Sequence, residues 1–412
     1  MMQNAVAKDQ LMRWRLPSYR DCAAYTITAS SAELAELVST IPSSTILLEL
    51  SWHLTGPVVL DELQAIKLFT VTNDLNSLTL FTRHEITTTI AKAFLQLPDI
   101  HFDRLTYLDV QYLRHPPMPE LRDIFGRCIS LKKLSFSTHR DILIPLRLSP
   151  HFLPRLEELD ILGGYTINCD ILPLKQLKAL LLSSMDTQCM VKLLHQTVNL
   201  KSLSLRSITR YGSMDIIVSR LGSLEYLLLD IDCAEVLDFL SFPKLTTLSM
   251  EKYWMGIMSR GLPTPKIRDF LARSGCILQT FHYSDLRGNY LENYELLRSL
   301  LDALPSLRDF LSDDDYTVLF TDDLLIKMKD NILLPKLQAL KIWIESPALF
   351  ADVIESRVNS ELREEGFIRL KTAFASYWTY KDGVRTVVPQ AALEKLEGMN
   401  AMYGTNFKMV AH

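Results

Sequence analysis

A hexapeptide pattern, L-x-x-L-x-L with a tolerant last position, recurs along the chain and restricts its fold more than any other feature. Successive copies start 21 to 33 residues apart, and an earlier partial copy spans residues 48–52. Units of this length bury their apolar faces only against one another, so they are expected to stack. The copies begin at Leu75, Leu105, Leu131, Leu156, Leu177, Leu200, Leu224, Leu245, Leu278, Leu307, Leu337 and Leu370.

Alternation at the fourth and sixth positions of each copy predicts a short strand with one buried face. Segments of helical period lie between several copies, at residues 86–97, 120–128, 190–198 and 294–304. In residues 190–198 the apolar helix face is expected to include Val198. The predicted fold is therefore α/β, an irregular leucine-rich-repeat solenoid of about a dozen strand-turn-helix units with terminal caps. Irregularity is expected because no regular Asn or Cys follows the strands.

At the two ends the repeat pattern dissolves, which indicates caps that shield the terminal core leucines. Residues 30–41 read as a helix, residues 374–388 as a hairpin turned at Lys381-Asp382-Gly383, and residues 391–399 as a last helix. The predicted domains are an N-terminal cap region without a recognisable F-box at 1–44, the solenoid at 45–375, and a C-terminal hairpin strand with a capping helix at 376–412.

Charge and composition argue against two classes of partner. The net charge is −4 and no Lys/Arg run occurs, so nucleic-acid binding is not expected. No stretch reaches 18 apolar residues, and residues 1–17 carry charges throughout, which argues against a membrane span and a secretory signal. The six cysteines are scattered without a C-x-x-C pair, as in a reduced, cytoplasmic or nuclear protein.

The motifs of common enzyme chemistry are missing from the sequence. There is no G-x-x-x-x-G-K-[ST], G-x-G-x-x-G or G-x-S-x-G, and no two histidines lie four residues apart. The run Asp313-Asp314-Asp315 is interpreted as a solvated loop, with a divalent-cation site as the alternative. We therefore expect no catalytic residue, no cofactor and no metal site.

The stretch from Arg273 to His282 allows two interpretations. Arg273, Cys276 and His282 contain the groups of a nucleophile, its base and an anion-binding cation. Alternatively, Pro265 opens a helix that Gly275 ends, and a buried, unactivated Cys276 leads into the next strand. We favour the second interpretation, with Phe281 and Tyr283 in the core and His282 exposed.

The same stretch carries a family resemblance. The run from Phe270 to Phe281, FLARSGCILQTF, resembles a phrase of F-box-type leucine-rich-repeat proteins of mushroom-forming fungi. The phrases LPSLRDF, TDDLLIKM and LLPKLQALKI follow in the order those proteins show, and residues 353–357, VIESR, resemble part of their closing segment. The likeness covers residues 265–374 and is generic across the earlier repeats.

This resemblance implies a function in protein degradation. In that family an amino-terminal F-box recruits the small adaptor of a cullin-type ubiquitin ligase, while the repeats bind substrate. Here Leu16-Pro17 is followed by Ser18-Tyr19-Arg20-Asp21 rather than the L-P-x-E opening of an F-box. The F-box is thus either lost or divergent, and the adaptor is a doubtful partner.

The predicted binding surface is the concave side of the solenoid. If positions four and six of each copy point inward, positions three, five and seven line this surface. Leu162, Leu181 and Leu228 would form an apolar strip with a charged and aromatic margin, which is typical of protein-binding patches. The predicted binding residues are Leu162, Leu181, Arg206, Tyr226, Leu228, Asp230, Glu251, Tyr253, Trp254, His282 and Trp343.

The sequence therefore predicts a non-catalytic interaction module that binds a protein ligand on its concave face, with a ubiquitin-ligase substrate receptor as the sharper version. Two alternatives stay open: a small-molecule binder or enzyme built on the same scaffold, and a structural subunit of a larger assembly.

Overall fold

The computed structural model describes residues 22–29, 46–54, 77–82, 102–112, 126–138, 153–162, 173–208, 219–252, 263–284, 290–312, 320–359, 368–377, 380–381, 384–385 and 388–411. The chain divides into two units. Unit 1 comprises Met1–Leu200 and Ile208–Gly212, and unit 2 comprises Lys201–Ser207 and Ser213–His412.

Unit 1 contains a parallel sheet with strands in chain order. Each strand pairs with the next, and the pairing shifts register only between β1 and β2. The strands are β1 (Cys22–Ala29), β2 (Ile46–Leu54), β3 (Ser77–Thr82), β4 (Tyr107–Tyr112), β5 (Lys133–Thr138), β6 (Glu158–Leu162) and β7 (Ala179–Ser183). The connections include the short 3-10 helix η2 (Leu174–Gln176) and the helix α7 (Thr187–Leu194).

Unit 2 also contains a parallel sheet, and its neighbouring strands pair without a register shift. In sheet order the strands are β8 (Ser202–Arg206), β10 (Tyr226–Asp230), β12 (Thr247–Glu251), β13 (Thr280–Ser284), β14 (Asp309–Ser312), β15 (Ala339–Trp343), β16 (Thr372–Tyr377) and β19 (Asn406–Ala411). Two minor pairs are β9 (Ser219–Arg220) with β11 (Leu240–Ser241), parallel, and β17 (Tyr380–Lys381) with β18 (Val384–Arg385), antiparallel.

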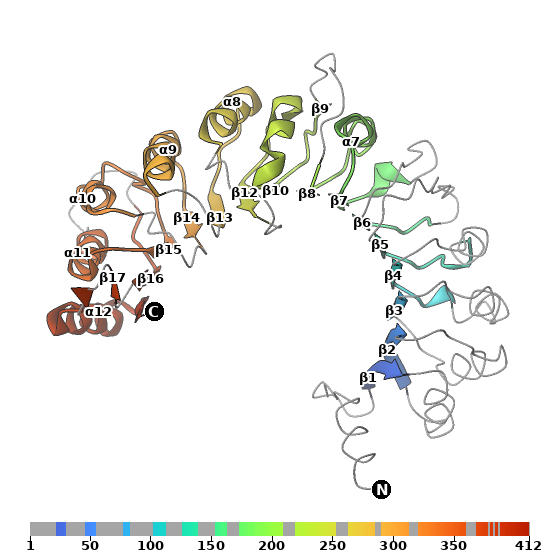
Figure 1. The fold of residues 1–412 in the computed structure, drawn as a ribbon, viewed down its shortest axis with the longest axis horizontal. Coiled ribbons are helices and arrows are strands. Elements are labelled where there is room, and N and C mark those ends of the chain that lie inside the picture. The colour runs from blue at the N-terminus through green and yellow to red at the C-terminus, as the bar shows by residue number, and fades with distance from the viewer. Residues whose placement is uncertain are drawn as a thin grey trace, which may run out of the picture. The chain divides into compact units, whose positions relative to one another are not determined.

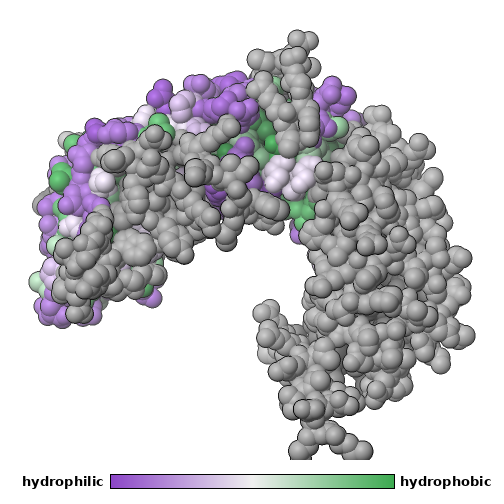
Figure 2. All heavy atoms as spheres, viewed as in Figure 1, coloured by the Kyte–Doolittle hydropathy of each residue, from purple (hydrophilic) through white to green (hydrophobic). Residues whose placement is uncertain are grey.

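Helices cover one face of the unit 2 sheet (Figure 1). They are the 3-10 helix η3 (Ile231–Phe239), α8 (Thr264–Ser274), α9 (Tyr290–Asp302), α10 (Asp322–Lys329), α11 (Pro347–Val358) and α12 (Gln390–Tyr403). Hydrophilic side chains predominate on the outer surface of this helical layer (Figure 2). The core of unit 2 therefore lies between its strands and its helices, and the sheet has a second face on the side away from the helices.

The repeated apolar positions build the core. From Leu105 to Leu370, every leucine at position one of a copy is at most 3% exposed. Position four is equally buried, and in unit 2 it holds the Phe281 and Phe310 rings, whose centroids lie 6.0 Å apart. Wherever the structure describes the side chains, the prediction that positions four and six point inward is confirmed.

Backbone hydrogen bonds explain why position one marks the entry to each strand. The position-one N–H donates to the carbonyl three residues earlier, as from Leu131 to Cys128 and from Leu337 to Leu334. The position-two carbonyl then accepts two N–H groups from the next copy, as Glu225 O accepts from Thr246 and Thr247. A tight turn thus sets the strand's start, and a shared acceptor aligns it with its neighbour.

Several predicted helices are present with shifted bounds. Residues 294–304 correspond to α9 and residues 391–399 to α12, while Asp322 and Asp323 open α10. The placement of Val198 on a helix face is wrong, because α7 ends at Leu194 and Val198 is 56% exposed. The turn after α7 is held by Thr197, whose hydroxyl donates to the Leu194 carbonyl. The predicted helices at 30–41 and 86–97 lie outside the described residues, as do residues 120–125 of the segment 120–128.

The Arg273-Ser274-Gly275 phrase ends α8 and joins it to the preceding connection. Gly275 adopts φ +61°, the left-handed conformation that closes many helices. The buried Ser274 hydroxyl accepts the Phe242 N–H at 3.0 Å. Arg273 donates to the carbonyls of Leu237 and Leu240, where η3 ends. The helix-ending interpretation of this stretch is therefore confirmed.

A second arginine, Arg357 in α11, likewise donates to backbone carbonyls near the end of the preceding helix. The Arg357 guanidinium is 1% exposed and donates to the carbonyls of Met328, Leu333 and Leu334 at 2.5 to 2.9 Å. The Ser356 hydroxyl donates to the Lys329 carbonyl at 2.7 Å. These four acceptors lie at the end of α10 and in the turn after it, so α11 satisfies carbonyl groups that the preceding helix leaves open.

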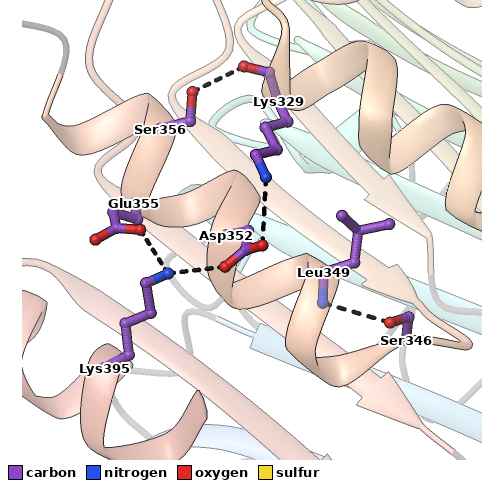
Figure 3. Close-up of polar contacts among 7 residues, drawn as sticks. All are labelled: Lys329, Ser346, Leu349, Asp352, Glu355, Ser356 and Lys395. Atoms are coloured by element: carbon purple, nitrogen blue, oxygen red, sulfur yellow. Dashed lines mark hydrogen bonds and ion pairs between the residues drawn. The ribbon is translucent and has the colours of Figure 1, made fainter. Parts of the chain in front are cut away.

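An ionic network connects α10, α11 and α12 (Figure 3). Asp352 of α11 accepts from Lys395 of α12 at 2.8 Å and from Lys329 of α10 at 3.3 Å. Lys395 also contacts Glu355 at 2.5 Å. The hydrogen bond from Lys395, with that from Lys329, lowers the pKa of Asp352. Through this network α12 is attached to the helical layer.

The sheet reaches beyond residues 45–375 at both ends. β1 pairs with β2 within unit 1, and β19 pairs with β16 within unit 2. The predicted hairpin is present in shorter form, since β17 and β18 flank its turn while residues 372–377 belong to β16. The C-terminal segment thus contributes a further parallel strand as well as a helix.

Arg357→Ala should lower the free energy of unfolding by on the order of 3 kcal/mol, because it leaves three buried carbonyls without their donor. Urea unfolding followed by circular dichroism measures the change. Arg155→Ala removes an exposed arginine and serves as the control. Equal midpoint shifts in the two variants would contradict the role given to Arg357.

Candidate functional site

The sheet of unit 2 presents two rows of side chains on the face opposite its helices, here called the strand face. From β8 to β16 these side chains come from positions three and five of the copies and are mostly half-buried between buried neighbours, and β19 adds two more. The unshifted register aligns them from strand to strand. Row three is Ser202, Tyr226, Thr247, Thr280, Asp309, Ala339, Thr372 and Asn406, and row five is Ser204, Leu228, Ser249, His282, Leu311, Lys341, Phe374 and Lys408.

Ser249 is the centre of a polar cluster on this face. Its Oγ donates to Glu251 Oε1 at 3.0 Å and lies 3.0 Å from His282 Nδ1. Glu251 Oε1 also lies 3.5 Å from His282 Nδ1. The Ser249 hydroxyl thus contacts both Glu251 and His282 Nδ1, and the tautomer of the imidazole ring decides which group donates in the contact with His282. These contacts hold Glu251 and His282 beside Ser249 on the strand face.

Tyr226 and Arg206 complete the polar cluster, which we define as Arg206, Tyr226, Ser249, Glu251 and His282. The pKa of Tyr226 is raised, first by burial and then by the negative charge of Glu251. Its hydrogen bond with Ser249 and the positive charge of Arg206 act in the opposite direction. The cluster thus joins side chains from β8, β10, β12 and β13.

The polar cluster contains Ser, His and Glu but lacks the geometry of a hydrolase triad. In a triad the carboxylate holds one ring nitrogen while the serine uses the other. Here Ser249 and Glu251 both approach the same ring nitrogen of His282, Nδ1. Ser249 is also only 2% exposed. The arrangement orients side chains and does not activate a nucleophile.

Apolar side chains border the polar cluster in row five. Leu228 pairs in register with Ser249, and Leu311 pairs with His282. Both leucines are half-buried, and Phe374 lies farther along the same row. The strand face therefore combines a hydrogen-bonded polar centre with partly exposed apolar groups on either side.

The structure brings only some of the predicted binding residues to this face. Arg206, Tyr226, Leu228, Glu251 and His282 lie together on it, each half-buried. His282, which we expected to be exposed, is instead held in the cluster.

The assignment of Asp230 and Trp343 to the exposed surface is wrong. They are 2% and 3% exposed, although Asp230 pairs in register with Glu251 and Trp343 pairs with Ser376. The Asp230 carboxylate accepts the Asp232 N–H at 3.2 Å and caps η3. A charged side chain at position seven is therefore used here as a helix cap.

The remaining predicted residues fall elsewhere. Tyr253 and Trp254 lie outside the described residues. Leu162 and Leu181 belong to unit 1 and are half-buried, but Leu181 pairs with Asp160 rather than with Leu162. Within unit 1 the two leucines thus lie on a diagonal and not in one row.

The predicted binding residues did not include four contributors to the strand face: Ser249, Leu311, Lys341 and Phe374. All four lie at position five of their copies, one of the positions expected to line the surface, but they were not selected as binding residues. Lys408 was also overlooked, and it carries no such signal because no leucine hexapeptide precedes β19.

Cys276 is unsuited to nucleophilic chemistry. Its side chain is half-buried rather than fully buried as expected, and burial raises the pKa of its thiol. His282 lies in the polar cluster, and Arg273 donates to the carbonyls of Leu237 and Leu240. The three groups are therefore engaged in separate interactions.

Unit 1 carries a charged cluster on its own strands. Lys133 contacts Glu158 at 3.2 Å and Asp160 at 3.3 Å, and its ammonium lies 5.8 Å from the centre of the Tyr107 ring. Burial raises the pKa of Asp160, an effect that Lys133 only partly offsets. Burial, with the nearby charge of Asp109, raises the pKa of Tyr107 to about 12.

Within the described segments, no group of three or more His, Cys, Asp or Glu side chains is arranged to hold a metal ion. The helices in those segments are all too short or too polar to cross a membrane. Asp313-Asp314-Asp315 lies outside them, so its interpretation stays a prediction.

Asp160→Asn should make stability less sensitive to pH. The folded-state pKa of Asp160 lies above 3.8, so its ionisation favours the unfolded chain and costs stability as pH rises through the folded pKa. The variant should therefore gain stability relative to the parent between pH 3 and pH 7. Urea midpoints at both values test this, with the more exposed Glu158→Gln as control. If the variant were less stable than the parent at pH 7, the ion pair of Asp160 with Lys133 would stabilise the fold by more than burial of the charged carboxylate costs.

In comparisons with protein-family models and with curated proteins, nothing matches this chain.

Proposed function

We propose that this chain is a leucine-rich-repeat solenoid that acts without catalysis, by binding a protein partner on the strand face of unit 2. The identification of the repeat is supported by one parallel strand per hexapeptide copy and by the burial of positions one, four and six. When such units stack, side chains from several neighbouring strands together form one extended binding surface.

The observation that carries the proposal is the composition of the strand face around the polar cluster. Leu228 and Leu311 are partly exposed, while Tyr226 and Arg206 supply residue types that dominate binding hot spots. The hydrogen bonds of Ser249 fix Glu251 and His282 in advance, which lowers the entropy cost of binding. An apolar surface with a prearranged polar centre suits a protein ligand.

The enzyme alternative receives no support from the cluster's chemistry. The only Ser-His-Glu arrangement among the described residues places serine and carboxylate on the same ring nitrogen. A binding role requires oriented donors and acceptors, and the cluster has these.

Arg206→Glu combined with Leu228→Asp should abolish capture of the natural partner, because both side chains lie on the strand face. The fold should stay intact, because both side chains are only half-buried. Quantitative mass spectrometry of material co-purified with the tagged full chain measures this loss. The control is Arg268→Glu with Ile326→Asp, which makes the same charge change on exposed residues of α8 and α10. Equal capture by both double variants would overturn the assignment of the strand face.

The resemblance of residues 265–374 to F-box-type leucine-rich-repeat proteins supports a narrower form of the proposal, a substrate receptor of a cullin-type ubiquitin ligase. This form predicts that the ligase adaptor co-purifies with the parent and with Arg206→Glu/Leu228→Asp alike, because adaptor and substrate would use different regions. Absence of the adaptor from the parent sample would refute the narrower form and leave the binding role intact.

A further inference from the structure

The strand β19 has an outer edge, on the side away from β16. In the described part of the chain β19 pairs only with β16. The Asn406 N–H donates to the Lys371 carbonyl, so Asn406 directs its backbone groups towards β16. Successive residues of a strand turn these groups to opposite sides, so Phe407, Met409 and Ala411 direct theirs to the outer edge. Such groups can bind a strand of another chain.

The side-chain amide of Asn400 in α12 already binds the first residue of this edge. The Phe407 N–H donates to Asn400 Oδ1 at 2.8 Å, and Asn400 Nδ2 donates to the Phe407 carbonyl at 2.9 Å. A side-chain amide carries the same kinds of donor and acceptor as a peptide group. Asn400 therefore binds Phe407 as a residue of a neighbouring strand would.

The connection between α12 and β19 holds the amide in this position. Gly404 ends α12 with φ +63°, and its N–H donates to the Asn400 carbonyl at 3.0 Å. The Thr405 hydroxyl donates to Asn400 Oδ1 at 3.2 Å. The backbone and the side chain of Asn400 are thus both held at the turn, and the amide is directed at the edge of β19.

We propose that the Asn400 amide keeps the outer edge of β19 from pairing with the same edge of a second copy of this chain. Two identical edges would pair about a two-fold axis, as antiparallel strands. The register that uses all three outward residues is centred on Met409 and pairs Phe407 of each copy with Ala411 of the other. Asn400 blocks Phe407 in both copies, so two of these three pairs cannot form. The inference does not depend on the proposed function.

Asn400→Ala opens the edge, because it removes both hydrogen bonds to Phe407 and keeps a residue type that favours helix. Sedimentation equilibrium of the purified full chain over a wide range of concentration measures self-association. The variant should associate at least about tenfold more tightly than the parent, because two pairs with two backbone hydrogen bonds each become available. The matched control is Asn359→Ala, which removes the acceptor of the Tyr403 hydroxyl and leaves the edge of β19 unchanged. This control should associate as the parent does.

A second substitution tests whether the new contact uses β19. Met409→Pro removes an N–H that points to the outer edge, so the hydrogen bonds with β16 stay in place. In Asn400→Ala/Met409→Pro the association should return to the parent level, because each copy loses a donor at the centre of the register. Met409→Pro alone should behave as the parent does.

Hydrogen exchange of the parent tests the edge without any substitution, and it decides the question if circular dichroism shows that Asn400→Ala does not fold. The Phe407 amide should exchange slowly, because Asn400 accepts its hydrogen bond. The Met409 amide should exchange faster and should stay fast as the protein concentration rises, because the edge does not pair.

Three results would overturn the inference. They are equal self-association of Asn400→Ala and Asn359→Ala, an association of Asn400→Ala that survives Met409→Pro, and a Met409 amide in the parent that is as protected as that of Phe407.

Discussion

A backbone carbonyl at position two of a copy aligns neighbouring strands within each unit. It accepts two N–H groups from the following copy, as Thr246 O accepts from Gln279 and Thr280, and Gln279 O accepts from Arg308 and Asp309. Because the acceptor lies at the same position in each of these copies, neighbouring strands begin in register. The rows of side chains on the strand face are a direct result, since any shift by one residue would turn them into the core.

The connections on the other side of the sheet differ in length and type, yet they are joined by a common device. Arg273 in α8 and Arg357 in α11 each donate to carbonyls near the end of the preceding helical segment. Guanidinium groups thereby bind the open carbonyl groups at the end of a 3-10 helix and of an α-helix alike. Variable connectors are tolerated because the guanidinium reaches whichever carbonyls the preceding segment leaves open.

The sequence was sufficient to predict the parallel strands and the core, because the leucine period reports directly on burial. It was less reliable where local geometry ends an element. Val198 continues the apolar period of α7, yet the turn fixed by Thr197 places it in solvent. Asp230 and Trp343 continue the alternation of their strands, yet both side chains are buried.

The candidate site was only partly predictable for a similar reason. Counting positions identified Tyr226, Leu228 and His282, but the importance of Ser249 arises from contacts between β12 and β13. Residues 33 apart in the sequence meet there through the register, and no local pattern encodes the meeting. Lys408 illustrates the limit, since its strand follows α12 and has no hexapeptide of its own.

The contacts of Arg273 and Arg357 also affect what a shared sequence phrase says about relationships between proteins. Arg273, Ser274 and Arg357 occur in the very phrases that resemble other proteins, and all three bind backbone atoms on the helical side. Selection on these positions would preserve the joints between neighbouring coils, whatever ligand the molecule carries. Two chains could then share both phrases and recognise unrelated partners, and divergence in ligand would be recorded only in rows three and five.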